Sequence, residues 1–172
     1  PTKYPDRISL PDSTSNAGLG ALNTEMEYGC LTDLHKFEGC AWFRREVEII
    51  PEMSGKNLTL FLERTRKTRV YIDGNQIGEY CSLCTPHRYD LTGLPAGKHE
   101  LIIRVDNTDY PTGGGHLTSR DTQTNWNGIV GRIELQSYSA YPEYVYAIPD
   151  PDKKTLHVRA WIKGAHCGTA SL

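Results

Sequence analysis

The sequence predicts an all-β protein in which two antiparallel sheets pack together as a sandwich. Between residues 41 and 136, apolar and polar side chains alternate in several short runs, as they do in strands that are buried on one face. Gly, Pro, Asn and Asp separate these runs, and such residues are typical of turns. Sheets with one apolar face must bury those faces against each other, so a sandwich follows.

Residues 1–36 precede the first regular alternation. They are rich in Pro, Ser, Thr, Asn and Gly, and we expect a leader that wraps around the sandwich. A short helix within residues 23–36 is an alternative, which Gly29 weakens by about 1 kcal/mol relative to alanine.

The predicted strands follow in chain order. In the first strand, one face carries Phe43, Arg45, Val47 and Ile49. Later core faces are carried by Leu58, Leu60 and Leu62, by Val70 and Ile72, by Leu101, Ile103 and Val105, and by Ile133 and Leu135. Asp73-Gly74 accepts positive backbone angles at low cost and predicts a tight hairpin turn. We also expect Trp42 and Tyr71 to be core residues.

The last part of the chain has a different character. Residues 137–144 are interpreted as a linker, followed by strands at 145–148 and 156–162. A lone hairpin is only marginally stable in water. Residues 145–163 are therefore interpreted as the start of a second domain.

Five motifs occur in a fixed order along the sandwich. They are residues 39–45 (GCAWFRR), 70–74 (VYIDG), 89–92 (YDLT), 104–107 (RVDN) and 126–132 (WNGIVGR). In this order they resemble the N-terminal sugar-binding domain of family 2 glycoside hydrolases, the group with β-galactosidases, β-glucuronidases and β-mannosidases. The resemblance spans roughly residues 37–136. It implies an antiparallel jelly-roll β-sandwich of the galactose-binding-domain-like kind.

The resemblance also implies a domain division and a function. Residues 1–36 would be the leader, residues 37–144 the jelly-roll domain with its linker, and residues 145–172 the truncated start of an immunoglobulin-like sandwich. Family 2 enzymes cleave β-glycosides by a retaining mechanism, with two carboxylates at the strand ends of a (β/α)₈ barrel. This chain lacks the long strand–helix alternation of a barrel and the common hydrolase motifs, so we expect no catalytic residue and no cofactor in it. The expected partners are carbohydrate and the barrel and immunoglobulin-like domains of the same parent chain.

The densest polar segment covers residues 116–127 and follows three glycines. Planar polar side chains bond sugar hydroxyls, and an aromatic face packs on the C–H side of the ring. The predicted sugar-binding residues are His116, Arg120, Asp121, Gln123, Asn125, Trp126 and Asn127. In the family, the loop before a Gly-Ile pair reaches the active-site rim, and an aspartate on it can bind the terminal sugar. Here Gly128-Ile129 matches that Gly-Ile pair. The position six residues before the glycine, where the family's aspartate is expected, is occupied by Thr122, and Asp121 lies one residue away from it. In the alternative interpretation, Trp126 is a buried structural residue of the core and does not contact sugar.

Two clusters have metal-ligand chemistry. Residues 81–87 (CSLCTPH) carry two thiols and an imidazole at zinc-knuckle spacing, but a fourth ligand is missing, which favours a structural loop. Asp106, Asn107 and Asp109 offer hard oxygen donors for calcium or sodium, but three donors are too few and a solvated turn is favoured. We therefore expect no metal site.

Composition excludes two partner classes. With 19 Lys and Arg against 21 Asp and Glu, the net charge is −2, so nucleic acid is not an expected partner. No apolar run is long enough to cross a bilayer, so we expect no membrane partner. Five cysteines at irregular spacing argue against a disulfide framework, although a bridge such as Cys30 with Cys40 stays open. The first residues lack an export signal, yet enzymes of this kind are commonly exported by bacteria, which suggests a periplasmic or extracellular location.

Three functions are compatible with these observations. The first is the accessory domain of a family 2 enzyme, with residues 116–127 at the rim of the sugar pocket. The second is a free-standing carbohydrate-binding module, and the third is a purely structural sandwich. The unfinished hairpin at residues 145–163 favours the first over the second.

Overall fold

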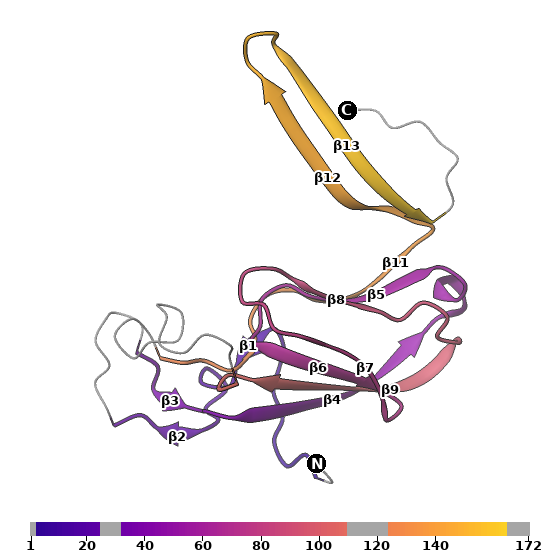
Figure 1. Ribbon diagram of the computed structural model, residues 1–172. Helices are drawn as coiled ribbons and strands as arrows, with labels where there is room; N and C mark the ends of the chain where they lie inside the picture. The colour runs from indigo at the N-terminus through magenta and orange to yellow at the C-terminus, as the bar shows by residue number, and fades with distance from the viewer. Residues whose placement is uncertain (1–2, 25–31, 110–123, 165–172) are drawn as a thin grey trace.

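The computed structural model describes residues 3–24, 32–109 and 124–164, and its fold is all-β and antiparallel, as predicted (Figure 1). Two sheets form a sandwich, one with the strand order β4-β9-β6-β7 and the other with the order β11-β5-β8. The first sheet contains β4 (Cys40–Ile49), β9 (Gly97–Asp106), β6 (Lys67–Ile72) and β7 (Asn75–Tyr80). The second contains β11 (Ile133–Tyr138), β5 (Asn57–Leu62) and β8 (His87–Asp90). The jelly-roll order that the resemblance implies stays a prediction.

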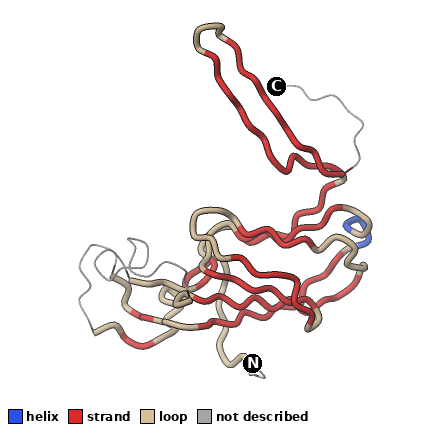
Figure 2. Tube along the Cα trace, viewed as in Figure 1, coloured by secondary structure: helices blue, strands red, loops and turns tan. Residues whose placement is uncertain are grey.

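One short strand pair attaches the leader to the sandwich, and a second pair lies within the leader itself. β1 (Asp12–Ser13) pairs with β10 (Gly128–Ile129), and β2 (Ala21–Leu22) pairs with β3 (His35–Lys36). A single 3₁₀ turn, Pro51–Met53, is the helical element of the described residues (Figure 2). Within these residues, no helix has the length and apolar character that a membrane span requires.

The core lies between the two sheets and contains the predicted faces together with Tyr89, Leu91 and Ile129, which the alternation had not identified. Its buried side chains are each 5% exposed or less: Ile49, Leu58, Leu60, Leu62, Val70, Ile72, Tyr89, Leu91, Leu101, Ile103, Val105 and Ile129. Ile133 and Leu135 pack against this cluster from the edge strand β11 and are half-buried. The alternation in the sequence therefore identified the inward faces correctly.

The hairpin between β6 and β7 is confirmed, because Asp73 (φ 49°) and Gly74 (φ 80°) both have positive φ, as a two-residue hairpin loop requires. The expectation that Trp42 and Tyr71 are core residues is wrong. Successive side chains in a strand point to opposite faces. Phe43 and the neighbours of Tyr71 point inward, so Trp42 and Tyr71 lie half-buried on the outer face, where their rings stack with centroids 6.0 Å apart.

β12 (Ala140–Asp150) and β13 (Thr155–Gly164) form a hairpin that projects from the sandwich (Figure 1). Its large apolar side chains are exposed, for example Tyr144 at 58% and Trp161 at 50%. The segment 137–144, interpreted as a linker, is extended and is shared between β11 and β12, interrupted only at Ser139. The assignment of residues 145–172 to a second domain stays a prediction.

Candidate functional site

Three distant parts of the chain meet at a cluster that we name the asparagine junction, consisting of Gly39, Asn107, Asn125 and Asn127. Gly39 precedes β4, Asn107 follows β9, and the other two asparagines precede β10. Gly39, Asn107 and Asn127 belong to three of the five sequence motifs, and Asn125 directly precedes one of these motifs. The junction therefore gives those motifs a common structural purpose.

Asn107 is the centre of the junction and is 0% exposed. Its Nδ2 donates to the carbonyl oxygens of Phe37 (2.6 Å) and Asn125 (3.0 Å), and its Oδ1 accepts from the N–H of Gly39 (2.8 Å). Asn125 returns the contact, since its Nδ2 donates to the backbone oxygen of Asn107 at 2.7 Å. The chain positions on either side of residues 110–123 are thereby bound to each other.

Asn127 fixes the same region to the leader and the sheet. Its side chain is 0% exposed, and its Nδ2 donates to the carbonyl oxygens of Gly39 (3.0 Å) and Val105 (3.2 Å). The backbone oxygen of Asn127 accepts from the N–H of Thr14 at 2.9 Å. A buried amide with these partners is an anchoring residue, because its side-chain hydrogen bonds join the chain before β10 to the backbone at Gly39 and at Val105 of β9.

Trp126 lies half-buried between these asparagines and rests on an arginine. The guanidinium of Arg66 lies 4.0 Å from the centre of the indole, and its Nε donates to the backbone oxygen of Trp126 at 3.0 Å. Arg66 is only 1% exposed, so this is a desolvated cation–π contact. One face of the indole is therefore occupied by protein.

Asp106 caps the turn that leaves β9. Its Oδ1 accepts from the N–H and hydroxyl of Thr108 and from the N–H of Asp109, and its Oδ2 accepts from Arg104 (2.6 Å) and the thiol of Cys40 (3.1 Å). Burial acts to raise the pKa of the Asp106 carboxyl, but the hydrogen bonds from Thr108, Cys40 and Asp109 outweigh it and hold that pKa well below its usual range. The Asp106 carboxylate therefore stays ionised, and both of its oxygens act as hydrogen-bond acceptors.

The predicted sugar-binding residues divide into two groups. His116, Arg120, Asp121 and Gln123 lie outside the described residues. The structure brings Asn125, Trp126 and Asn127 together, and it gives the two asparagines anchoring contacts within the protein. Their contact with sugar stays a prediction.

The zinc-knuckle stretch is a loop in which the imidazole points inward. His87 is 0% exposed, its Nε2 bonds the backbone oxygen of Ser82 at 2.8 Å, and its Nδ1 bonds the hydroxyl of Thr68 at 2.6 Å. Burial lowers the pKa of His87, opposed by the bond to Ser82, so the ring is neutral with its proton on Nε2. Both nitrogens are engaged, while Cys81 and Cys84 are exposed free thiols.

The second candidate metal cluster is also engaged in protein contacts. Both carboxylate oxygens of Asp106 accept hydrogen bonds, Oδ1 of Asn107 accepts from Gly39, and Oδ2 of Asp109 pairs with Lys67 at 2.6 Å. Among the residues that the structure describes, no group of three or more metal-ligating side chains is present.

Sequence reasoning missed Arg66. It lies in the charged run 63–69, which suggests a solvated surface. Yet Arg66 has the same parity as Thr68, Val70 and Ile72, which point inward from β6. Extending the period of two by one step would have placed its side chain inside the sandwich.

The fold defines the chain as an antiparallel β-sandwich in which the asparagine junction joins the chain before β4, after β9 and before β10. Comparison with family models and with curated proteins finds no match. Solved structures do match, and a β-glucuronidase from an uncultured Clostridium sp. superposes with a TM-score of 0.65 at 18% identity, covering 91% of this chain and 28% of that chain. The Faecalibacterium prausnitzii β-glucuronidase superposes with a TM-score of 0.59 at 20% identity, covering 77% of this chain and 28% of that chain.

A β-galacturonidase of glycoside hydrolase family 2 from Eisenbergiella tayi gives a TM-score of 0.54 at 22% identity, covering 72% of this chain and 21% of that chain. The resemblance to family 2 glycoside hydrolases is thus confirmed at the level of the fold. The chain spans less than a third of the length of each of these structures.

Proposed function

We propose that this chain is a non-catalytic accessory domain of a family 2 glycoside hydrolase whose parent chain cleaves terminal β-glycosides with retention. One observation carries the proposal: the sandwich superposes on such enzymes over 72% to 91% of this chain but accounts for only 21% to 28% of theirs. The greater part of an enzyme of that size is available for the catalytic barrel. Residues 145–172 would begin the next, immunoglobulin-like domain, and the exposed apolar side chains of β12 and β13 support this, because such a hairpin needs further packing.

The proposed task of the domain is to hold one wall of the sugar pocket. The asparagine junction binds Asn107 to Asn125 and thereby holds together the chain on either side of residues 110–123, which we propose form a loop. We propose that His116, Arg120, Asp121 and Gln123 on this loop face the sugar. The junction would supply the rigidity that a positioned loop needs, since binding residues are often carried on loops held by a rigid scaffold.

The proposed substrates are β-linked uronides. Structures that superpose on this chain are named β-glucuronidase and β-galacturonidase, the latter bound to galacturonate. The experiment is an activity assay of the parent polypeptide with p-nitrophenyl β-glucuronide, β-galacturonide, β-galactoside and β-mannoside. We expect one of the uronides to be hydrolysed and the 172-residue chain alone to be inactive on all four. A parent that hydrolyses none of them contradicts the proposal.

Trp126 tests the role of the loop base. In the parent, Trp126→Ala should raise KM for the hydrolysed sugar by up to about tenfold, equivalent to the roughly 1.5 kcal/mol of an aromatic contact, with a smaller effect on kcat. Trp42→Ala is the matched control, because Trp42 is also half-buried but lies on the outer face of β4. Equal effects of the two substitutions would contradict a role for the loop base in sugar binding.

Fluorescence titration of the 172-residue chain with the free sugars separates the other candidates. Measurable affinity that Trp126→Ala removes would support a carbohydrate-binding module. An active parent whose KM is unchanged by Trp126→Ala, together with no affinity in the isolated chain, would support a purely structural sandwich.

A further inference from the structure

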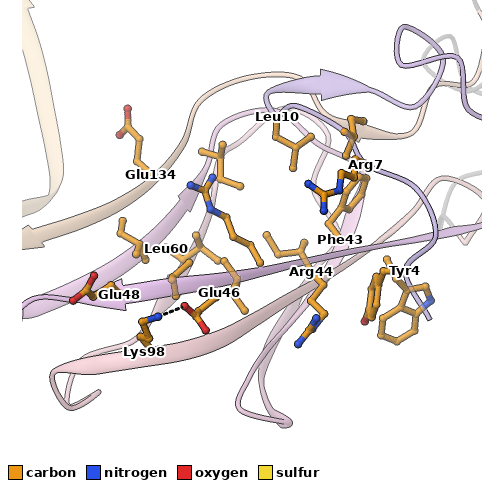
Figure 3. A pocket seen from close by; sticks show the side chains of 18 of the residues that line it. Tyr4, Arg7, Leu10, Phe43, Arg44, Glu46, Glu48, Leu60, Lys98 and Glu134 are labelled. Carbon is orange, nitrogen blue, oxygen red and sulfur yellow. Dashed lines mark ion pairs between the residues drawn. The ribbon is translucent and has the colours of Figure 1, made fainter. Parts of the chain in front are cut away.

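The sandwich is open along one side, between the edge strands β4 and β11. A groove of about 880 Å³ runs there, and its floor is formed by core residues of both sheets, including Leu60, Leu101 and Ile103. Figure 3 shows Tyr4 and Leu10 of the leader on one side of this groove, and Glu46 of β4 with its ion-pair partner Lys98 of β9 on the other. We name it the edge groove.

The apolar core reaches the surface in the edge groove. Inward-facing residues of the central strands are almost fully buried, with Leu60 at 1% and Leu101 at 5% exposure. The inward residues of the two edge strands are only half-buried, as for Phe43, Val47 and Ile133. Of the seven half-buried apolar residues that pack against the core, five line this groove: Leu10, Phe43, Val47, Ile133 and Leu135. This concentration indicates a core that lacks its last layer on that side, because burial of apolar surface is the main stabilising contribution in such folds.

The backbone of β4 is free on the same side, because β4 has no neighbour beyond it among the described strands. The N–H of Asp73 donates to the backbone oxygen of Glu100, which continues the register between β6 and β9. Backbone N–H and C=O groups point to alternate sides along a strand. Even-numbered residues of β9 therefore form their backbone hydrogen bonds with β6, and odd-numbered residues form theirs with β4. The register pairs Leu101 with Arg45, so odd-numbered residues of β4 bond β9. The even-numbered residues of β4 therefore direct their N–H and C=O groups to the free edge.

Arg45 adds a charge to this apolar row. It has the same parity as Phe43 and Val47, lines the edge groove, and forms no ion pair with any described residue. Its neighbours Arg44 and Glu46 pair with Glu100 and Lys98 on the other face of the sheet. A strand laid over Arg45 would bury the guanidinium and would need to supply a carboxylate, since a buried charge without a partner is costly.

We propose that the edge groove is filled by an extended strand of the parent polypeptide from outside these 172 residues. This strand pairs with the free edge of β4, places apolar side chains on the groove floor at alternate positions, and sets a carboxylate opposite Arg45. The inference rests on the proposed function in one respect, namely that a longer parent chain supplies the strand; the β-glucuronidases that superpose on this chain leave 72% of their own length uncovered, as 28% is matched.

A sugar and a second copy fit the groove less well. Several planar polar side chains line the groove, including Arg7, Arg45 and Glu134, but its floor is formed by Leu60, Leu101 and Ile103, which suit the apolar side chains of a strand better than the hydroxyl groups of a sugar. A second copy of the chain could pair its β4 with this β4 in antiparallel fashion around a two-fold axis. If the axis lies at the middle of the strand, Arg44 faces Arg44 of the other copy, or Arg45 faces Arg45. Like charges directly opposite each other are destabilising.

Amide hydrogen exchange tests the proposal in the parent polypeptide and in the 172-residue chain. The amides of Trp42, Arg44, Glu46 and Glu48 should exchange at least about tenfold more slowly in the parent, because the added strand bonds them. The odd-numbered amides of β4 should be protected in both chains. Rapid exchange of the even-numbered amides in the parent would overturn the inference, as would a gene that encodes no further residues.

Three controls complete the test. In the parent, Arg45→Glu should remove the added protection, whereas Arg44→Glu, one residue away on the outer face, should leave it; equal effects would overturn the carboxylate pairing.

Concentration-dependent protection in the 172-residue chain would identify a second copy as the occupant and would likewise overturn the proposal. Glycosidase activity of the parent is measured separately, so an active parent with an unprotected β4 edge contradicts this inference and leaves the proposed function standing.

Discussion

Replacing Asn107 by alanine removes three side-chain hydrogen bonds from a position that is 0% exposed: two from Nδ2, to Phe37 and Asn125, and one to Oδ1, from Gly39. A hydrogen bond contributes about 1 kcal/mol net in a folded protein. We therefore expect the free energy of unfolding to fall by about 3 kcal/mol, which raises the unfolded fraction by about a hundredfold.

The assay is urea denaturation followed by tryptophan fluorescence, with the midpoint and the slope compared between wild type and variant. Asn75→Ala is the matched control, because Asn75 is exposed and its one side-chain hydrogen bond, to the oxygen of Asp73, is long at 3.4 Å. This control should change stability by less than about 0.5 kcal/mol. A loss for Asn107→Ala as small as that of the control would refute the assignment of the junction as an anchor.

Two further perturbations test other contacts. The hydrogen bond to Asp73 raises the pKa of His99, and the bond to the backbone oxygen of Pro95 adds to this effect. The protonated imidazole therefore stabilises the folded state. This contribution is complete at pH values below the unfolded-state pKa of about 6.5 and is lost as pH rises through the higher folded-state pKa. The free energy of unfolding should therefore fall as pH rises through this range in wild type but not in His99→Gln, and parallel pH profiles would contradict the pairing. A Cβ on Gly128 (φ 127°) would meet the backbone oxygen of Asp12 at 2.5 Å, whereas Gly93 (φ 91°) has no atom within 4 Å of that position. Gly128→Ala should thus cost about 2 kcal/mol more than Gly93→Ala in the same denaturation assay, and equal costs would show that the leader is easily displaced.

Much of the fold follows from local rules. A period of two decides which side chains of a strand face inward, so the core positions on β5, β6 and β9 could be predicted from the sequence. The turn at Asp73-Gly74 could also be predicted, because positive φ at both positions is a local requirement of a two-residue hairpin.

The rest depends on contacts that are remote in sequence. Arg66 looks like a surface residue within a charged run, and although the strand parity of β6 turns it inward, its partner Trp126 lies 60 positions away in the sequence. Trp42 is an error of a different kind, because its aromatic character suggested core although the local strand parity set by Phe43 places it on the outer face. No local pattern indicates that Asn107 and Asn127 meet at Gly39, because amides of this kind are also common in solvated turns.

The asparagine junction also has a consequence for the lifetime of the native state. Its contacts join residues that are 70 positions apart (Asn107 and Phe37), 88 apart (Asn127 and Gly39) and 113 apart (Asn127 and Thr14). Contacts of such long sequence separation are gained only after the loops between them have closed, so we expect them to be absent from the folding transition state. Weakening the junction should then accelerate unfolding and leave the refolding rate nearly unchanged. The three asparagines would thus act as a kinetic latch, whose strength determines how long the folded domain persists before it opens.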